Sequence, residues 1–399
     1  MKNRNFYILW LRDSLIAFSS ALTSSSVLSG QLLHAGMGED KISLYLAFVP
    51  FINLGFSLGF SGITARVKRT IPAYTLLCLL SGVFTSCFAL VFAFTVKEKL
   101  LFLLLMLTGC LVTAVTAVRT IFDYKLPCEV MKSDEYSLYV SVGGILGSVF
   151  GIAGGLLLSF FYKRFEFTAV SCGAFLAAGC SLCLSSLINR RLKIKTENTA
   201  PAAGGKKSSA NIGALLKNKS FKRLALPNFI RGIGMAAVPM ITVFAVSAGV
   251  LNESDGAAVT VCTYLGTLIS CTLYAFLSRR VKIKNICVGG AVLFCALVPS
   301  FAGGRTGFFI CYTLAYIGYY AVSCAVPDLV YRSITSDIMS VFHTWRLALS
   351  TVGTTVATAV MGKLIGTVSP VWILLAAALS QIICAAAYYI EFRSAESKR

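Results

Sequence analysis

The 399-residue chain is 57% hydrophobic and 13% charged, and its mean hydropathy is +0.79. A soluble domain carries about 25% charged residues, so this composition excludes an ordinary water-soluble fold. The net charge of +20 would suit nucleic-acid binding, but the Lys and Arg residues stand in short clusters between long apolar runs. We therefore expect the lipid bilayer, and no nucleic acid, as a partner.

Long apolar runs follow one another along the whole chain, and each is long enough to cross the hydrocarbon core as a helix of about 20 residues. The runs are continuous rather than alternating, which favours helices over the short strands of a membrane barrel. The sequence therefore predicts an all-α membrane protein with twelve transmembrane helices. The predicted spans are 6–33, 42–64, 72–95, 100–121, 138–161, 166–188, 222–250, 256–278, 284–302, 306–327, 340–365 and 369–391.

A basic segment separates the sixth span from the seventh. It is rich in Lys, Arg, Gly, Ser and Ala and has no apolar period, which is typical of a flexible linker. It divides the chain into a six-helix bundle at 1–189, a linker at 190–220 and a second six-helix bundle at 221–399.

Short motifs recur at equivalent positions of the two halves, which indicates an internal repeat. The frame Ser-Asp-x-x-Ser-x-aromatic begins at Ser133 before the fifth span and at Ser336 before the eleventh. Basic stretches also follow the second span of each half. The first span of each half opens with a Phe and a Leu three residues later, at Phe6 and Phe221.

Basic residues concentrate in alternate loops, on the side that holds both termini. The positive-inside rule then places both termini in the cytoplasm. Because Arg12 and Asp13 lie near the start of a long first run, we interpret that run as a retained span rather than a signal peptide. The predicted location is the cell (inner, cytoplasmic) membrane, as a multi-pass protein.

Two six-helix halves joined by a basic loop resemble the major facilitator superfamily of secondary transporters. Between the second and third spans that family carries the pattern Gly-x-x-Asp-Arg-x-Gly-Arg-Arg. This chain keeps Gly62, Arg66 and Arg69, but Ala65 replaces the Asp. The resemblance implies two pseudo-symmetric bundles, alternating access, and a substrate cavity between the halves lined by helices one, four, seven and ten. It implies a transporter rather than an enzyme, and we expect a monomer.

Other classes of membrane protein find less support in the sequence. The sequence contains no HExxH motif, no histidine cluster and no GxSxG motif with partners, which a membrane enzyme would need. It also contains no GxxxxGK[ST] pattern, which ATP binding would need. The cysteines lie mostly in apolar runs, where a thiol behaves as a small hydrophobe. We predict no metal and no cofactor, apart from coupling to H+ or Na+. A lipid-handling enzyme and a channel stay as alternatives.

Ionisable side chains inside a span are costly, so each is a functional hypothesis. Arg231 lies deepest and is predicted to pair with Asp13 in one state, and Arg119 and Asp123 share one helix face. These charges either pair and close a cytoplasmic gate or contact the substrate. Coupling through Asp13 and facilitated diffusion are both open. The predicted gating or coupling residues are Arg12, Asp13, Arg66, Arg69, Arg119, Asp123, Asp328, His343 and Arg346.

Neutral polar side chains line the middle of the predicted spans. Hydroxyl groups and aromatic rings on one face suit a neutral polar solute such as a sugar, although Ser, Thr and Tyr also pack helices without binding anything. Export of amphipathic drugs or lipid-like compounds fits the same lining, and acidic substrates would use Arg231 and Arg119 as anchors. The predicted substrate-binding residues are Thr23, Asn53, Asn228, Arg231, Tyr312, Tyr316, Tyr319 and Tyr320.

Overall fold

The structure is a computed structural model, and its regular elements are helices throughout the part of the chain that it describes. The predicted all-α membrane fold is confirmed. The described residues are 4–67, 69–93, 98–130, 133–193, 218–278, 280–333, 336–365 and 367–393.

The first predicted span, 6–33, is wrong as a single helix, because the chain breaks at Thr23 and Ser24 into α1 (Arg4–Leu22) and α2 (Ser25–His34). Ser24 is the N-cap of α2, and its hydroxyl accepts a hydrogen bond from the Val27 N–H at 3.3 Å. Thr23 turns its hydroxyl back to the Ser19 carbonyl at 3.0 Å. Hydroxyl side chains compete with the helix for backbone groups, which is the physical reason for the break.

The next five helices follow the predicted spans, and most extend beyond them by several residues. Pro50 lies inside α3 without ending it. The helices are α3 (Glu39–Arg66), α4 (Thr70–Ala93), α5 (Glu98–Val130), α6 (Ser133–Tyr162) and α7 (Phe167–Asn189).

The second half repeats this succession. Its first helix is continuous although it contains Pro227 and Pro239, and the span predicted at 284–302 changes from an α-helix to a 3₁₀ helix. The elements are α9 (Lys219–Ser247), η2 (Glu253–Asp255), α10 (Gly256–Leu277), α11 (Ile283–Phe294), η3 (Cys295–Phe301), α12 (Gly304–Ser333), α13 (Ser336–Leu364) and α14 (Pro370–Glu391).

Eleven candidate spans in the described part of the chain are long and apolar enough to cross a membrane, judged by length and composition. They correspond to the second through twelfth predicted spans. α1 is not among them; it carries Arg4, Arg12 and Asp13 in 19 residues.

The chain forms two compact units. Unit 1 comprises Met1–Lys41, Phe48–Gly205 and Glu253–Tyr264, and unit 2 comprises Ile42–Ala47, Lys206–Asn252 and Leu265–Arg399. The predicted boundaries at 189 and 221 stay a prediction, and most of the predicted linker lies outside the described residues.

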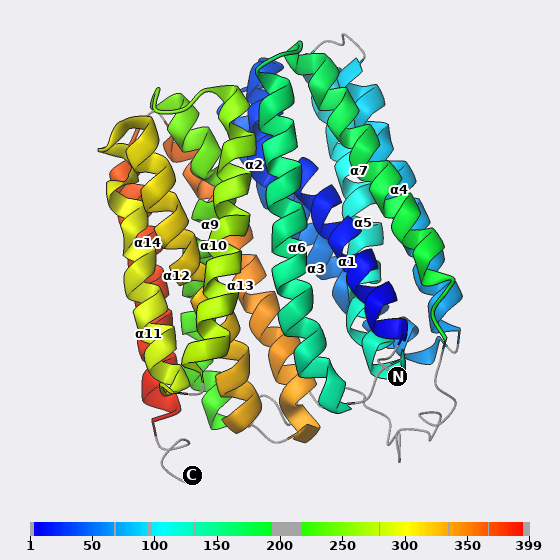
Figure 1. Cartoon of the computed structure of the whole chain (residues 1–399). Coiled ribbons are helices and arrows are strands. Elements are labelled where there is room, and N and C mark those ends of the chain that lie inside the picture. Colours follow the sequence, from blue (N-terminus) through cyan, green and yellow to red (C-terminus); the bar gives the residue numbers. More distant parts are fainter. Residues whose placement is uncertain are drawn as a thin grey trace. The chain divides into compact units, whose positions relative to one another are not determined.

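In unit 1, α4 packs along α7, and α1 packs against α6 and α7 (Figure 1). Glycines allow the close approach of α4 and α7: a Cβ on Gly82 would lie 2.7 Å from the Gly179 carbonyl oxygen. A Cβ on Gly179 would lie 2.6 Å from the Gly82 carbonyl oxygen. Small residues of this kind let membrane helices pack backbone to backbone.

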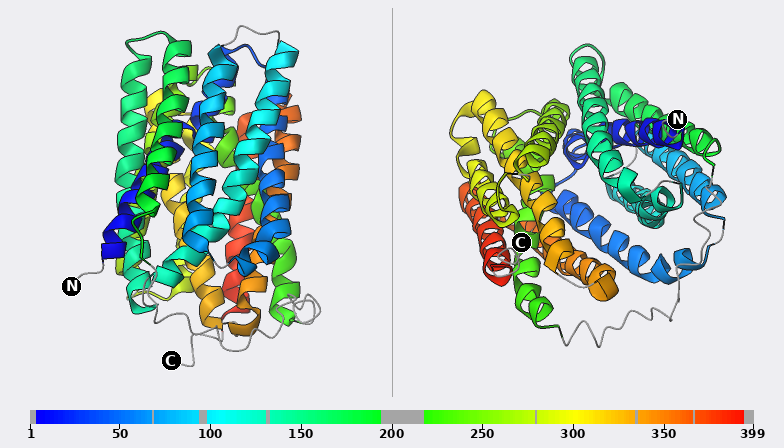
Figure 2. Two further views of the ribbon diagram at one scale, coloured as in Figure 1. Left: turned by 90° about the vertical axis from the view of Figure 1, so that its right-hand side faces the viewer. Right: turned by 60° about the horizontal axis from the view of Figure 1, so that its bottom comes forward.

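In unit 2, α9 packs against α13 and α14, and α11 lies between α12 and α14 (Figure 2). Gly232 of α9 faces α13, where an added Cβ would lie 2.4 Å from the Thr354 nitrogen. A Cβ on Gly353 of α13 would in turn overlap the Phe229 carbonyl oxygen. The two helices therefore approach each other through their backbones.

The repeat seen in the sequence extends to the cores of the units. Phe6 and Leu9 pack in one hydrophobic cluster of unit 1, and Phe221 and Leu224 pack in one cluster of unit 2. Each cluster also holds a Leu that lies seven residues before the Ser-Asp frame, at positions 126 and 329. Equivalent residues therefore build equivalent cores.

Candidate functional site

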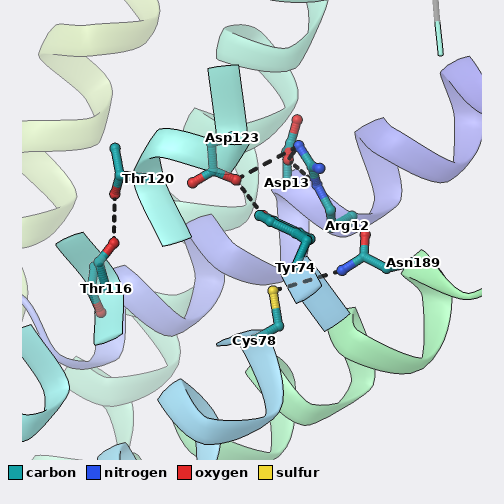
Figure 3. Close-up of polar contacts among 8 residues, drawn as sticks. All are labelled: Arg12, Asp13, Tyr74, Cys78, Thr116, Thr120, Asp123 and Asn189. Atoms are coloured by element: carbon teal, nitrogen blue, oxygen red, sulfur yellow. Dashed lines mark hydrogen bonds and ion pairs between the residues drawn. The ribbon is translucent and has the colours of Figure 1, made fainter. Parts of the chain in front are cut away.

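A cluster of charged side chains in unit 1 lies where α1, α4 and α5 meet (Figure 3). Arg12 is 1% exposed, and its Nε donates to Asp13 Oδ1 at 2.7 Å while its Nη2 lies 2.5 Å from the same oxygen. Asp123 of α5 lies 4.0 Å from Arg12 Nη2 and accepts a hydrogen bond from the Tyr74 hydroxyl. The Tyr74 ring lies 5.0 Å from the Arg12 guanidinium carbon, at cation–π distance. We name Arg12, Asp13, Tyr74 and Asp123 the acidic network.

Neighbouring polar contacts fix the helices that carry the acidic network. At the start of α1, the Asn5 amide donates to the Lys193 carbonyl at 2.8 Å and accepts from the Lys193 N–H at 3.2 Å. At the end of α7, Asn189 Nδ2 lies 3.7 Å from Cys78 Sγ, one turn after Tyr74 on α4 (Figure 3). These contacts tie the beginning of α1 and α4 to the end of α7.

The acidic network holds two carboxylates for one guanidinium. Asp13 and Asp123 are each about one-quarter exposed, so both keep some accessible surface while Arg12 is enclosed. Burying a charge without a partner is strongly unfavourable, and the adjacent carboxylates supply that partner.

Arg119 of α5 does not complete this arrangement. It is 6% exposed, and its Nε and Nη1 have no hydrogen-bond partner among the described residues. The pairing of Arg119 with Asp123, which their spacing allows, is replaced by the contacts of Asp123 with Tyr74 and Arg12.

A second polar cluster lies in unit 2, on α9, α12, α13 and α14. Arg231 is 4% exposed, and its Nη2 donates to Ser323 Oγ at 3.0 Å. Gln381 Nε2 of α14 donates to the Arg231 carbonyl at 3.4 Å. Arg346 of α13 is also 4% exposed, and it interacts with the hydroxyl of Tyr388.

Asn228 connects the helices of this second cluster. Its Oδ1 accepts from the Tyr388 hydroxyl at 3.1 Å, and its backbone carbonyl accepts from Ser350 at 2.9 Å. We name Asn228, Arg231, Ser323, Arg346, Ser350, Gln381 and Tyr388 the arginine cluster. The guanidinium groups of Arg231 and Arg346 contact hydroxyl groups, whereas that of Arg12 contacts carboxylates.

The predicted pairing of Arg231 with Asp13 stays a prediction. Asp13 is bound by Arg12, and Arg231 is bound by Ser323, each within its own unit.

The predicted tyrosine stripe lies on α12. Tyr312 is 2% exposed and stacks on Phe308, with ring centroids 5.9 Å apart. Tyr316, Tyr319 and Tyr320 are half-buried, and Tyr316 lies between Tyr312 and Tyr319 at centroid distances of 5.9 and 5.4 Å. Three of the four rings therefore keep some exposed surface.

The remaining predicted residues are scattered. Thr23 stands at the break between α1 and α2, and Asn53 is half-buried on α3, where it accepts from Ser57 at 3.3 Å. Arg69 is exposed before α4. The side chains of Arg66, Asp328 and His343 lie outside the described residues.

The sequence reasoning did not single out Tyr74, Gln381 or Tyr388. Gln381 had a usable signal, because a polar amide inside an apolar span is rare and costly. The two tyrosines gave none, since tyrosine is common at membrane interfaces.

The helices and their order define a class of fold: the chain adopts the fold of major facilitator transporters. One similar structure is a bacterial homologue of the human lysosomal transporter Spinster, in an inward-facing and unoccupied conformation. The TM-score is 0.69 at 16% identity, and the match covers 100% of this chain and 99% of that one. Another is the nucleoside transporter NupG, with a TM-score of 0.71 at 15% identity over 98% of this chain and 99% of that one. No family model matches the chain, and no curated protein matches its sequence.

Proposed function

We propose that the protein is a secondary transporter, which carries a small solute across the cytoplasmic membrane by alternating access. The whole-chain likeness to solved transporters carries this proposal, because it covers at least 98% of the chain at TM-scores of 0.69 and 0.71. The transporter fold accounts for nearly the whole length, so we propose no enzymatic activity. We place both termini in the cytoplasm by the distribution of basic residues and propose a monomer.

Buried charges inside the helices support a carrier. Arg12, Arg119, Arg231 and Arg346 are each at most 6% exposed. Ionisable groups at such positions are rare in structural membrane helices and are typical of solute and ion pathways. A carrier that rocks between two states can exchange the partners of these groups.

The acidic network favours the proton as coupling ion. It places Asp13 and Asp123 beside Arg12, so that one carboxylate would take up a proton while the other still faces the guanidinium. We propose that this network binds the coupling proton; Na+ is the alternative.

An apolar groove in unit 1 favours a second candidate, the export of amphipathic compounds. Its volume of about 430 Å³ falls within the range of drug-sized pockets. Its lining from α1, α6 and α7 includes Phe18, Leu158, Phe161 and Val170.

Counterflow in proteoliposomes tests the function. Vesicles containing the full chain would be loaded with an excess of one unlabelled solute and diluted into a trace of the labelled form. The panel would comprise sugars, nucleosides, amino acids, organic anions and lipophilic cations, each with and without a pH or Na+ gradient. We expect transient, saturable accumulation of one class, which a carrier produces and a channel does not.

Matched variants make the counterflow result specific. Asp13→Asn should reduce counterflow or its pH dependence at least tenfold, whereas Arg223→Gln should not. Arg223 is an exposed arginine of α9 that pairs with Glu391 at 3.3 Å. Flux without counterflow would indicate a channel, and no flux of any class would contradict transport. Accumulation of lipophilic cations alone would select the second candidate.

A further inference from the structure

Two buried arginines share the arginine cluster of unit 2. Arg231 on α9 and Arg346 on α13 are each 4% exposed. The two helices are joined beside them, because the Ser350 hydroxyl, one turn after Arg346, donates to the Asn228 carbonyl at 2.9 Å, three residues before Arg231. The positive charges of the two arginines therefore act on each other. Like charges brought together away from water repel strongly. Among the side chains that the structure describes, this pair has no negative partner, and such an arrangement favours the binding of an anion.

The described side chains that contact the two arginines are neutral. Arg231 donates to Ser323, and Arg346 contacts Tyr388, whose hydroxyl in turn donates to Asn228. Glu391 is the one carboxylate of unit 2 whose side chain the structure describes. It is held by Ser220 at 2.6 Å and by Arg223 at 3.3 Å.

Some buried polar atoms of the arginine cluster have no hydrogen-bond partner among the described residues. The Nε atoms of Arg231 and Arg346 are buried and have no partner among the described residues. The Oε1 atom of Gln381 is likewise a buried acceptor without a partner in the described part of the chain. Buried polar groups are normally satisfied, and native exceptions call for an explanation such as a missing ligand.

The geometry points to a binding site for an anion. We propose that Arg231 and Arg346 bind a small solute carrying a dianionic group, either a phosphate monoester or a pair of carboxylates. The inference rests on the proposed function, since it names the class of solute that the transporter carries. It replaces the expectation of a neutral sugar-like substrate.

The chemistry of the cluster fits this ligand. Guanidinium groups are always charged and present planar forks of donors that match phosphate and carboxylate oxygens. Two of them neutralise a dianion fully. The free acceptor of Gln381 would take a hydrogen bond from a hydroxyl group of the same solute.

Glycines hold the cluster together. Gly232 stands next to Arg231 and lets α9 approach α13 through the backbone, where a Cβ would lie 2.4 Å from the Thr354 nitrogen. Gly234 leaves the space that Gln381 fills, since a Cβ there would lie 2.4 Å from Gln381 Nε2. Close packing fixes both groups, as a specific site requires.

Thermal unfolding of the full chain tests the proposal directly. The protein would be purified in detergent without added lipid and melted with inorganic phosphate, glycerol 3-phosphate or succinate. Glycerol, and sodium chloride at equal ionic strength, are the neutral and salt controls. We expect at least one dianion to raise the melting temperature by about 5 °C at about 100 times its Kd. A parallel series with phosphatidylglycerol distinguishes a lipid headgroup from a soluble solute.

Substitutions at three arginines show where the anion binds. Arg231→Gln and Arg346→Gln should abolish the dianion response, and Arg223→Gln, on the same helix as Arg231, should keep it. Without ligand, the first two variants should melt no lower than the wild type, because each removes an uncompensated charge. Arg231→Lys and Arg346→Lys, which keep the charge, should retain a weaker response and guard against misfolding.

The outcomes separate cleanly. A shift by soluble dianions identifies the solute class, and a shift by phosphatidylglycerol alone assigns the same anion site to a lipid headgroup. An absent shift, or one that persists in both glutamine variants, overturns the proposal. Lower stability of Arg231→Gln without an anion response would show instead that Arg231 pairs with a carboxylate of the chain. Since melting needs no transport, a negative result leaves counterflow of another solute class intact.

Discussion

Arg12 in unit 1 and Arg231 in unit 2 follow equivalent Phe and Leu residues in their cores, yet their surroundings differ. Arg12 is neutralised by Asp13 and approached by Asp123, whereas Arg231 contacts Ser323 and lies near a second arginine. An internal repeat therefore conserves packing while the electrostatics of its copies diverge. In unit 1 two carboxylates accompany Arg12, and in unit 2 no carboxylate among the described side chains accompanies Arg231.

The largest effect is expected from removing a carboxylate from unit 1. Asp13→Asn leaves the buried guanidinium of Arg12 without its main partner, and we expect a loss of about 3 kcal/mol in the free energy of unfolding. Reversible unfolding in detergent measures it. The double variant Arg12→Gln/Asp13→Asn should recover most of the loss, and Arg223→Gln, at an exposed ion pair, should cost at most about 1 kcal/mol. Equal costs for Asp13→Asn and Arg223→Gln would contradict the buried network.

Two matched tyrosine substitutions compare a hydrogen bond to a charged acceptor in unit 1 with one to a neutral acceptor in unit 2. Tyr74 donates to the charged Asp123, so Tyr74→Phe should cost about 1.5–3 kcal/mol. Tyr388 donates to the neutral Asn228, so Tyr388→Phe should cost about 0.5–1.5 kcal/mol. Both variants keep the ring, and both are measured by the same unfolding assay. A larger cost in unit 2 would reverse the assignment of the charged network.

The first spans of the two units give a smaller contrast, because unit 1 breaks its span at Ser24 and unit 2 keeps α9 continuous. The Ser24 hydroxyl caps α2 and also lies 2.5 Å from Thr260 Oγ1. Ser24→Ala should cost about 1 kcal/mol, the usual value for a lost N-cap. Ser25→Ala, one residue later, is the matched control and should cost less. Hydrogen exchange at Val27 should increase in Ser24→Ala alone.

Most of the fold could be predicted from the sequence, because continuous apolar runs of span length have few other solutions in a membrane. The break at Ser24 could not, since serine is tolerated inside membrane helices as well as at their ends. The pairing of Arg12 with Asp13 was also hidden, because neighbours in a helix do not normally face each other. The contact of Tyr74 with Asp123 joins two helices whose relative rotation no sequence pattern reports.

The polar first helix affects how the protein is inserted into the membrane during its synthesis. A charged residue at the centre of a span costs about 2.5–3.5 kcal/mol on insertion, and Arg12 and Asp13, near the start of the first run, each cost up to that amount. The aspartate and tyrosine that help to offset this cost in the finished unit come from α4 and α5. At the usual speed of synthesis, the ribosome reaches Asp123 roughly 5 to 20 s after it completes α2. We therefore expect α1 to enter the bilayer late, after α4 and α5 have been inserted.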